Sequence, residues 1–450
     1  MPSVARSTVA PLYVLACLLL GGSAQGIWQN ALLQLAGLAI IGWAAVESSA
    51  EALPRASRPL LLLAVAAIAV VALQCIPLPS SFLASGIRTR IADGYSLLGQ
   101  TVPSLPVSLT PYASLAALLC IIPPLAVFCA IVRLRAYRTS WLATALLAGT
   151  TLGVMLGALQ VAAPNSAWYF YPETNRGQGV GFFANVNHMA SLLLMTFPFL
   201  AAIAAAGKSR NLQRYSALLA TLAGAAMVLV VGIALNGSLA GFALALPVLA
   251  ASAVLVLSRG NRARGWLMGI AAILVVVGVA GIANSSIGGS EMGQEAATSV
   301  QSRQQILRTT GQAIADFMPF GSGLGSFVKV YPLYEKPDLV TDEYVVHAHN
   351  DYAELALELG VVGIVLIVLF IAWWVIAVRA VWWRGEGGPF ARAAAIASAA
   401  VLVHSSVDFP LRTAAISACF AMCLGLMADR RVVQRQDAND LRPTRHITIR

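Results

Sequence analysis

The chain is organised around one polar stretch, His347-Ala348-His349-Asn350-Asp351-Tyr352-Ala353-Glu354-Leu355-Ala356-Leu357-Glu358-Leu359-Gly360. Asn350 is well placed to cap a helix that begins at Asp351. On that helix Asp351, Glu354 and Glu358 share one face, because residues three and four apart are neighbours. After Gly360 no charged residue appears before Arg379. The stretch therefore predicts the polar outer end of a membrane helix. The alternative is an interfacial turn whose charged face is solvated.

The composition is that of a membrane protein. Hydrophobic residues make up 58% of the 450 residues, and the mean hydropathy is +0.77. Apolar segments of roughly 17 to 25 residues recur along the chain, which is the length that a membrane-spanning helix needs. We predict an all-α polytopic membrane protein with about 12 transmembrane helices. The predicted spans are residues 8–24, 27–46, 59–76, 112–132, 139–162, 187–206, 216–235, 238–257, 266–284, 360–378, 391–409 and 412–428.

The first span has an alternative, because Arg6 precedes a short apolar core as in a signal peptide. No clear cleavage site of small residues follows it, so we favour a membrane helix. The six cysteines all lie in or beside predicted spans. They are interpreted as apolar packing residues and not as a disulfide framework or a metal site.

The spans divide the chain into four parts. Residues 1–284 hold the first nine helices and short periplasmic loops, and residues 285–359 form a large periplasmic loop between the ninth and tenth helices. Residues 360–428 hold the last three helices, and residues 429–450 form a cytoplasmic tail.

The basic residues predict the orientation in the membrane. With the N-terminus in the cytoplasm, 21 of the 29 lysines and arginines fall in cytoplasmic segments. The positive-inside rule then places both termini in the cytoplasm. The net charge of +10 is therefore a topology signal and indicates no nucleic-acid partner. The predicted outer cations are Arg88, Arg90, Arg176, Arg303, Arg308, Lys329, Lys336 and Arg412.

Two outer segments are predicted to form helices at the membrane surface. Phe82 to Leu98 alternates apolar and charged residues as an interfacial helix does. Further along, Thr298 and Ser299 are candidate caps of a helix that ends at Phe317, before Pro319. Arg303 lies near the apolar stripe of this second helix. Arg308 points about 140° away from Arg303, so we expect the two arginines to have different roles.

Three further outer motifs carry polar or flexible residues. Arg176 precedes a glycine-rich segment, and its alternative role is a snorkelling anchor at the membrane surface. The glycines of 321–325 are interpreted as a packing turn, because no strand precedes them as in a nucleotide site. His404 and Asp408 lie at the outer end of the eleventh span, where ionisable groups need partners or a polar cavity. Asp408 is either part of the site or a structural partner of Arg412.

These motifs together resemble the O-antigen ligase and polymerase superfamily, over about residues 105–425. The resemblance implies a membrane glycosyltransferase of the GT-C type that needs no metal or other cofactor. Its donor is a glycan on an undecaprenyl-diphosphate carrier. Its acceptor is lipid A–core oligosaccharide for a ligase, or another carrier-linked glycan for a polymerase. The motifs that carry the resemblance are Arg176…Gly181-Phe182…Asn185-Val186-Asn187-His188-Met189-Ala190, Ser302-Arg303…Pro319-Phe320-Gly321-Ser322-Gly323-Leu324-Gly325 and His347-Ala348-His349-Asn350-Asp351-Tyr352…Glu358-Leu359-Gly360…Gly363.

The resemblance assigns roles to residues within these motifs. Arg176 and Arg303 are expected to converge on the donor diphosphate, since arginine forms forked contacts with phosphate oxygens. His349 is the expected catalytic residue, because histidine is the usual proton acceptor near neutral pH. His347 is the reserve. The expected supporting residues are Asn187, Asn350 and Asp408.

Two other classes of function compete with this enzyme. A transporter or flippase of lipid-linked sugars has the same number of spans, but it is expected to carry polar or broken spans near the middle of the membrane. The polar motifs here lie at the outer ends of mostly clean spans, which favours chemistry at the outer surface. A structural assembly subunit is the third class. The sequence leaves ligase and polymerase open.

Overall fold

The computed structural model describes residues 4–24, 26–47, 53–79, 87–207, 212–257, 291–337, 340 and 344–429. These residues are almost entirely helical. The one sheet that they form is a short antiparallel pair of β1 (Pro77–Leu78) and β2 (Leu105–Pro106), with Pro77 opposite Pro106. The predicted all-α fold class is thus confirmed.

Most predicted spans are apolar helices in the structure. Eight helical segments of the described residues are long and apolar enough to cross a membrane, and α1, α15 and α16 are shorter apolar helices. Eleven of the twelve predicted spans are therefore helical, and the ninth, 266–284, lies outside the described residues. The apolar helices are α1 (Val4–Leu20), α2 (Trp28–Val46), α3 (Arg58–Gln74), α5 (Pro111–Leu119), α6 (Ile122–Val132), α7 (Thr139–Ala162), α8 (Val186–Ala206), α9 (Leu212–Asn236), α10 (Leu239–Leu257), α14 (Asp351–Trp382), α15 (Pro389–His404) and α16 (Ala414–Ala428).

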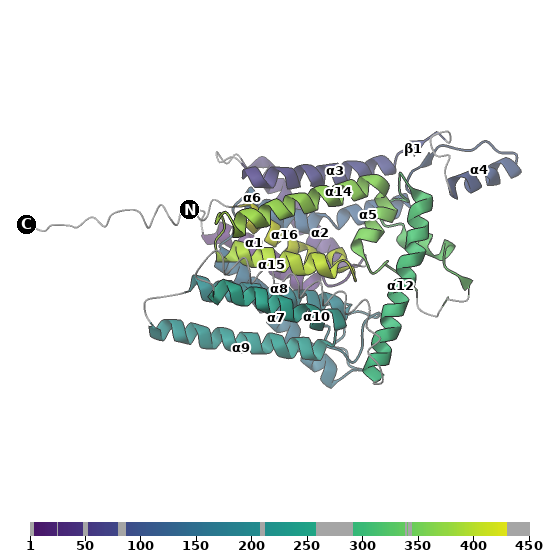
Figure 1. The fold of residues 1–450 in the computed structure, drawn as a ribbon. Helices are drawn as coiled ribbons and strands as arrows, with labels where there is room; N and C mark the ends of the chain where they lie inside the picture. Colours follow the sequence, from purple (N-terminus) through teal and green to yellow (C-terminus); the bar gives the residue numbers. More distant parts are fainter. Residues whose placement is uncertain are drawn as a thin grey trace, which may run out of the picture.

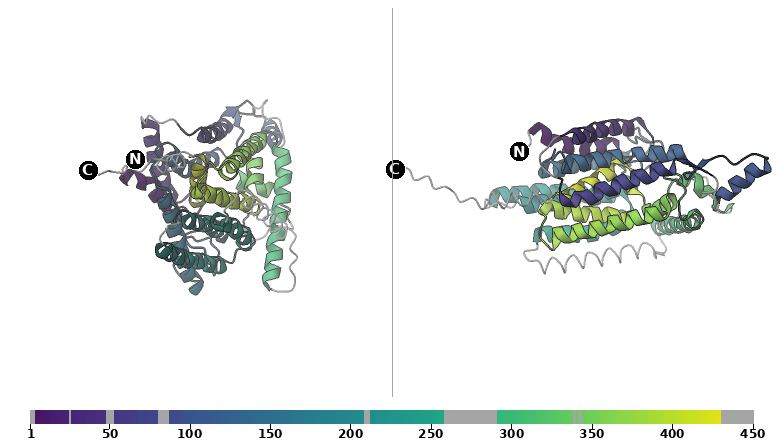
Figure 2. Two further views of the ribbon diagram at one scale, coloured as in Figure 1. Left: turned by 60° about the vertical axis from the view of Figure 1, so that its left-hand side comes forward. Right: turned by 90° about the horizontal axis from the view of Figure 1, so that it is seen from above.

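The long helices run side by side and form one bundle (Figure 1). Helix α8 is the most deeply buried of the candidate spans, with 78% of its apolar window inside the protein. It packs against α10 and α15. The amphipathic helix α12 (Glu291–Phe317) crosses one end of the bundle, and α4 (Ile87–Leu97) projects beyond the same end (Figures 1 and 2). The polar motifs of the sequence gather at this end.

One predicted helix boundary is wrong, and one predicted span contains a turn. The span 112–132 is a single candidate membrane span, Pro111–Val132, with a turn between α5 and α6. Pro123 and Pro124 explain the turn, since they lack the N–H groups that would continue a helix through Cys120 and Ile121. Helix α12 begins at Glu291, so Thr298 and Ser299 lie inside the helix and not at its N-terminus. No proline separates Glu291 from Thr298, and acidic residues stabilise a helix near its N-terminus.

The interfacial helix predicted at Phe82 to Leu98 is present as α4, although residues 80–86 lie outside the described part. Three short helical turns complete the outer end. They are α13 (Phe327–Val330), η3 (Tyr331–Leu333) and η5 (Pro410–Arg412), whereas η1 (Arg55–Ser57) precedes α3 at the other end of the bundle.

Helix α14 is interrupted at Gly360, which has φ 62° and ψ −145°. The polar outer end, Asp351–Leu359, is therefore a short helix of its own that leads into the membrane span. The interruption leaves backbone groups that neighbouring segments bind. Val361 N donates to Pro319 O at 2.9 Å, and Gly323 N donates to Glu358 O at 2.9 Å. The glycine-rich loop 321–325 is thus a turn that packs on α14.

Gly360→Ala is expected to destabilise the protein much more than Gly99→Ala. Both glycines have positive φ, 62° and 64°, and a non-glycine residue in such a conformation costs about 1–3 kcal/mol. A Cβ at Gly360 would lie 2.1 Å from Pro319 O, whereas a Cβ at Gly99 meets nothing within 4 Å. The midpoints of thermal unfolding of the two purified variants measure the difference. Equal shifts would contradict a steric role for Gly360.

Candidate active site

The site begins where the chain enters α14. The Asn350 side chain accepts a hydrogen bond from Ala353 N at 3.0 Å, which confirms the predicted cap. Its Nδ2 donates to Ser406 O at 2.9 Å. Asp351 N donates to Ser405 O at 2.9 Å. These bonds attach the start of α14 to the segment between α15 and α16, and they place Asn350 in a supporting position.

His349 stands in an unusual backbone conformation just before this cap. Its φ is +48°, a region that residues other than glycine seldom adopt. Such conformations persist only where the surrounding structure imposes them, and they gather at functional sites. The fixed geometry of the helix start therefore aims this imidazole in a defined direction.

Asp408 is the centre on which His349 and Arg303 converge. His349 Nδ1 lies 3.5 Å from Asp408 Oδ1, and an Arg303 guanidinium nitrogen lies 3.9 Å from Asp408 Oδ2. Phe409 N donates to Asp408 Oδ1 at 2.8 Å. Burial alone would raise the pKa of Asp408, but the nearby His349 and Arg303 groups outweigh burial and hold that pKa well below its usual range. The carboxylate is therefore a fixed negative charge between a guanidinium group and an imidazole ring.

His347 contacts a different carboxylate from the one that His349 contacts. Its Nδ1 lies 2.9 Å from Glu354 Oε1, and Ala348 N donates to Glu354 Oε2 at 2.9 Å. Glu354 is only 1% exposed. The Phe409 ring contacts both histidines, with its centroid 4.2 Å from that of His347 and 5.2 Å from that of His349.

Arg412 contacts all three carboxylates of the α14 face. Its guanidinium nitrogens lie 3.1 Å from Glu354, 3.3 Å from Glu358 and 3.6 Å from Asp351. This geometry confirms that the three acidic residues share one face. Burial opposes the charge of the guanidinium, but the carboxylates outweigh it and raise the pKa of Arg412.

The predicted alternative in which Asp408 pairs with Arg412 is wrong. Arg412 lies against α14, while Asp408 faces Arg303 and His349. The reason is that Arg412 sits four residues further on, in η5, where the chain has turned toward the acidic face of α14.

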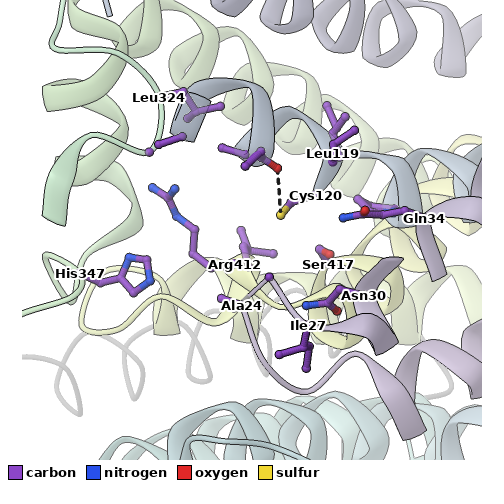
Figure 3. Close-up of a pocket in the computed structure, with 18 of the residues that line it drawn as sticks. Ala24, Ile27, Asn30, Gln34, Leu119, Cys120, Leu324, His347, Arg412 and Ser417 are labelled. Carbon is purple, nitrogen blue, oxygen red and sulfur yellow. Dashed lines mark hydrogen bonds between the residues drawn. The ribbon is translucent and has the colours of Figure 1, made fainter. Parts of the chain in front are cut away.

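A cavity of about 780 Å³ opens beside His347 between α2, α5, α6 and α16. Figure 3 shows His347 and Arg412 at one side of it, with Asn30, Gln34 and Ser417 on the other. Most of the wall is apolar, and small residues leave its space open. The small lining residues are Ala24, Gly26, Ala31, Ala113, Ala116, Ala117 and Gly325.

Arg176 and Asn187 lie apart from the Asp408 contacts. Arg176 is exposed, and its guanidinium carbon lies 5.4 Å from the centroid of the Tyr169 ring. Asn187 Oδ1 accepts a hydrogen bond from Ser238 Oγ at 2.7 Å, which attaches α8 to the start of α10. The convergence of Arg176 with Arg303 stays a prediction.

Two further histidines, for which the sequence predicts no role, lie in the site. His188 is 3% exposed, and its ring centroid lies 5.1 Å from that of Phe409. His404 is fully buried, and its Nδ1 lies 2.7 Å from Ser191 Oγ. Four of the five histidines of the chain thus meet around Phe409 and Asp408. The signal for both was their position in apolar segments, where an ionisable side chain is costly and usually functional.

No group of three or more histidine, cysteine, aspartate or glutamate side chains within the described ranges is arranged to hold a metal ion. Basic and acidic side chains alternate across this end of the bundle, with Asp408 between Arg303 and His349 and with Arg412 among three acidic residues.

Fold and site together define a polytopic all-α membrane protein with a cluster of histidine, arginine and carboxylate side chains at one end of its helices. Residues 224–368 match the family model described as O-antigen ligase. This match covers about a third of the chain and supports the resemblance to the O-antigen ligase and polymerase superfamily. It supports a glycosyltransferase-like role at the membrane in polysaccharide assembly. A search of curated proteins found no match.

Proposed function

We propose that the protein transfers a glycan from an undecaprenyl-diphosphate carrier to a hydroxyl group of an acceptor glycan. The acceptor is lipid A–core oligosaccharide or a second carrier-linked glycan. The observation that carries the proposal is the convergence of Arg303 and His349 on the buried Asp408 at one end of the bundle. The O-antigen ligase match includes both of these residues.

The chemistry of a diphosphate leaving group supports this assignment. Negative charge builds up on the diphosphate as the bond to the sugar breaks, and preorganised cations stabilise that charge. Arg303 is suited to this task because its side chain is 25% exposed and its contact with Asp408 is loose, at 3.9 Å. Part of the guanidinium fork therefore remains available for phosphate oxygens.

The location of the reaction follows from the predicted topology. Both termini are placed in the cytoplasm, and the loop 285–359 with α12 is placed on the periplasmic side of the bacterial inner membrane. The site at the α12 end of the bundle then faces the periplasm, where it meets the polar parts of both lipid-anchored substrates.

Arg303→Gln is expected to lower glycan transfer about 100-fold, the usual loss when one stabilising donor is removed from a reacting oxyanion. Arg308→Gln is the matched control, because Arg308 lies on the same helix and is exposed. We expect it to retain normal transfer. The assay uses purified protein in vesicles with lipid-linked donor and acceptor from extracted bacterial membranes. Equal activity of both variants would remove Arg303 from the site. Movement of the donor across the bilayer without any transfer would instead identify a transporter.

A further inference from the structure

We propose that His188 and His404 are positioning residues, and that they hold the Asp408 carboxylate in place through a buried water molecule that all three side chains bind. This inference rests on the proposed glycan transfer and deepens it, because Asp408 in turn orients His349 and Arg303. Neither His188 nor His404 touches the substrates. Their role is to fix the direction of the groups that do.

The two imidazoles are buried between helices, and most of their polar atoms lack partners. His188 in α8 is 3% exposed, and neither of its ring nitrogens has a hydrogen-bond partner within the described part of the chain. His404 at the end of α15 is fully buried, and its Nε2 likewise has no partner among the described residues. Buried polar atoms are nearly always hydrogen-bonded, either to protein or to ordered water. These three ring nitrogens therefore point to a small polar ligand between the helices.

The Asp408 carboxylate is the third group beside these rings with an unpartnered atom. Asp408 N donates to His404 O at 2.9 Å, and the His188 ring lies edge-on to the next residue, Phe409, with ring centroids 5.1 Å apart. Asp408 is fully buried, and its charge acts on both imidazoles. Its Oδ2 accepts no hydrogen bond from the described residues, because the Arg303 nitrogen at 3.9 Å lies beyond hydrogen-bond distance. The unpartnered atoms thus belong to three neighbouring side chains.

Ser191 determines what the remaining nitrogen of His404 can do. The Ser191 hydroxyl donates to Asn187 O at 3.2 Å, a bond that serine often forms with the preceding turn of a helix. We assign its oxygen as the acceptor of the His404 Nδ1 hydrogen, 2.7 Å away. In the neutral ring, Nε2 is then left with a lone pair. His404 Nε2 and Asp408 Oδ2 are therefore both acceptors, and they cannot form a hydrogen bond with each other.

A water molecule satisfies all of these groups at once. Its two hydrogens suit the two acceptors, His404 Nε2 and Asp408 Oδ2, and its oxygen accepts the N–H of the neutral His188 ring. A buried water in a protein typically makes about three hydrogen bonds of this kind. A metal ion does not fit the same place, because no three of the described histidine, cysteine, aspartate and glutamate side chains are arranged as its ligands.

With this water bound, both oxygens of the Asp408 carboxylate are held. Phe409 N donates to Oδ1 at 2.8 Å, and the water donates to Oδ2. The carboxylate is then fixed against rotation, so His349 beside Oδ1 and Arg303 beside Oδ2 keep one relative orientation. A displacement of about 1 Å among the groups around a reaction can lower its rate about 100-fold. His188 and His404 thus act on transfer through Asp408.

His188→Leu and His404→Leu are each expected to lower kcat for transfer about 100-fold, because the water loses a partner and Asp408 is no longer held. The assay uses purified protein in vesicles with lipid-linked donor and acceptor. The midpoint of thermal unfolding of His188→Leu should equal that of the wild type or exceed it, because neither ring nitrogen of His188 bonds the protein. His404→Gln keeps a polar group near the position of Nε2 and should restore much of the rate, which a purely structural role would not produce.

Thr196→Val is the matched control, because it removes a buried polar group from the same helix, α8. Thr196 is fully buried, and its hydroxyl donates to Leu192 O at 2.8 Å and lies 2.8 Å from that of Thr150. Valine has nearly the same shape but forms neither bond, so the midpoint of thermal unfolding should fall while kcat stays normal. Opposite responses of Thr196→Val and His188→Leu distinguish a structural polar group from a positioning one.

A density map of the wild type, at a resolution that shows ordered water, tests the water site directly. It should show a water within about 3.2 Å of both His404 Nε2 and Asp408 Oδ2. A map without this water, or normal transfer by either leucine variant, overturns the inference and leaves the proposed function standing. A leucine variant that does not fold, beside a folded Thr196→Val, shows a structural role and also overturns it. A wild-type protein without any transfer contradicts the proposed function, and the map and the unfolding midpoints then test the water site alone.

Discussion

Replacing His349 with alanine is expected to abolish glycan transfer while expression and membrane insertion stay near normal. His349 is held at the start of α14 by the cap at Asn350, and its side chain is 27% exposed. Few packing contacts are therefore lost, but the cationic or proton-transferring group nearest to Asp408 disappears. Transfer from lipid-linked donor, measured in vesicles with equal amounts of inserted protein, checks the expectation.

A second variant controls for the backbone of His349. Its φ of +48° disfavours alanine, whereas asparagine tolerates this conformation better. His349→Asn should therefore be as inactive as His349→Ala and closer to the wild type in thermal stability. If His349→Ala retains full transfer while His347→Ala does not, His349 is the wrong histidine. If both variants retain transfer, the catalytic interpretation of the stretch 347–360 is wrong.

The pH profile between about pH 5 and about pH 9 distinguishes two roles for His349. A general base loses activity as pH falls, and a cationic hydrogen-bond donor loses activity as pH rises. Asp408 does not contribute to either limb. Because the pKa of Asp408 is lowered in the folded protein, its stabilising charge is lost only when pH falls through that lowered value, outside this window.

The fold followed from the sequence because membrane helices are specified locally. Length and hydropathy are enough to place a span, and the helix 139–162 was predicted with the bounds that α7 has. Local detail was less predictable than the spans. Pro123 and Pro124 put a turn between α5 and α6 within one span, and the polar start of α12 extends beyond the expected caps.

The local part of the site was predictable for the same reason. The cap at Asn350 and the shared face of Asp351, Glu354 and Glu358 depend only on helical periodicity. Partners that are distant in the chain were not predictable. The spacing of Asp408 and Arg412 fits a pair on one helical turn, but the chain leaves α15 before Asp408 and forms η5. Only this turn shows that the two residues face different groups.

Arg412 is the cation that compensates the three carboxylates on the face of α14. We therefore expect a large loss of stability when it is replaced. Glu354 and Glu358 are 1% and 0% exposed, and each binds a loop as well as Arg412. Glu354 accepts a hydrogen bond from Ala348 N, and Glu358 accepts one from Gly325 N at 2.8 Å. Without the guanidinium, three carboxylates would face one another with no compensating cation.

Arg412→Met is therefore expected to lower the free energy of unfolding by about 3–5 kcal/mol, the usual cost of leaving a buried charge without its partner. Arg412→Lys should lie between this variant and the wild type, because an ammonium retains the charge but cannot reach three carboxylates as a planar fork does. Arg308→Met is the control for loss of an exposed arginine. The midpoints of thermal unfolding in one detergent give the comparison.

The loss of stability in Arg412→Met, relative to the wild type, should become smaller between about pH 8 and about pH 5, since protonation of the carboxylates removes their mutual repulsion. A loss of stability that does not depend on pH, or one as small as that of Arg308→Met, would show that Arg412 does not stabilise the acidic face of α14.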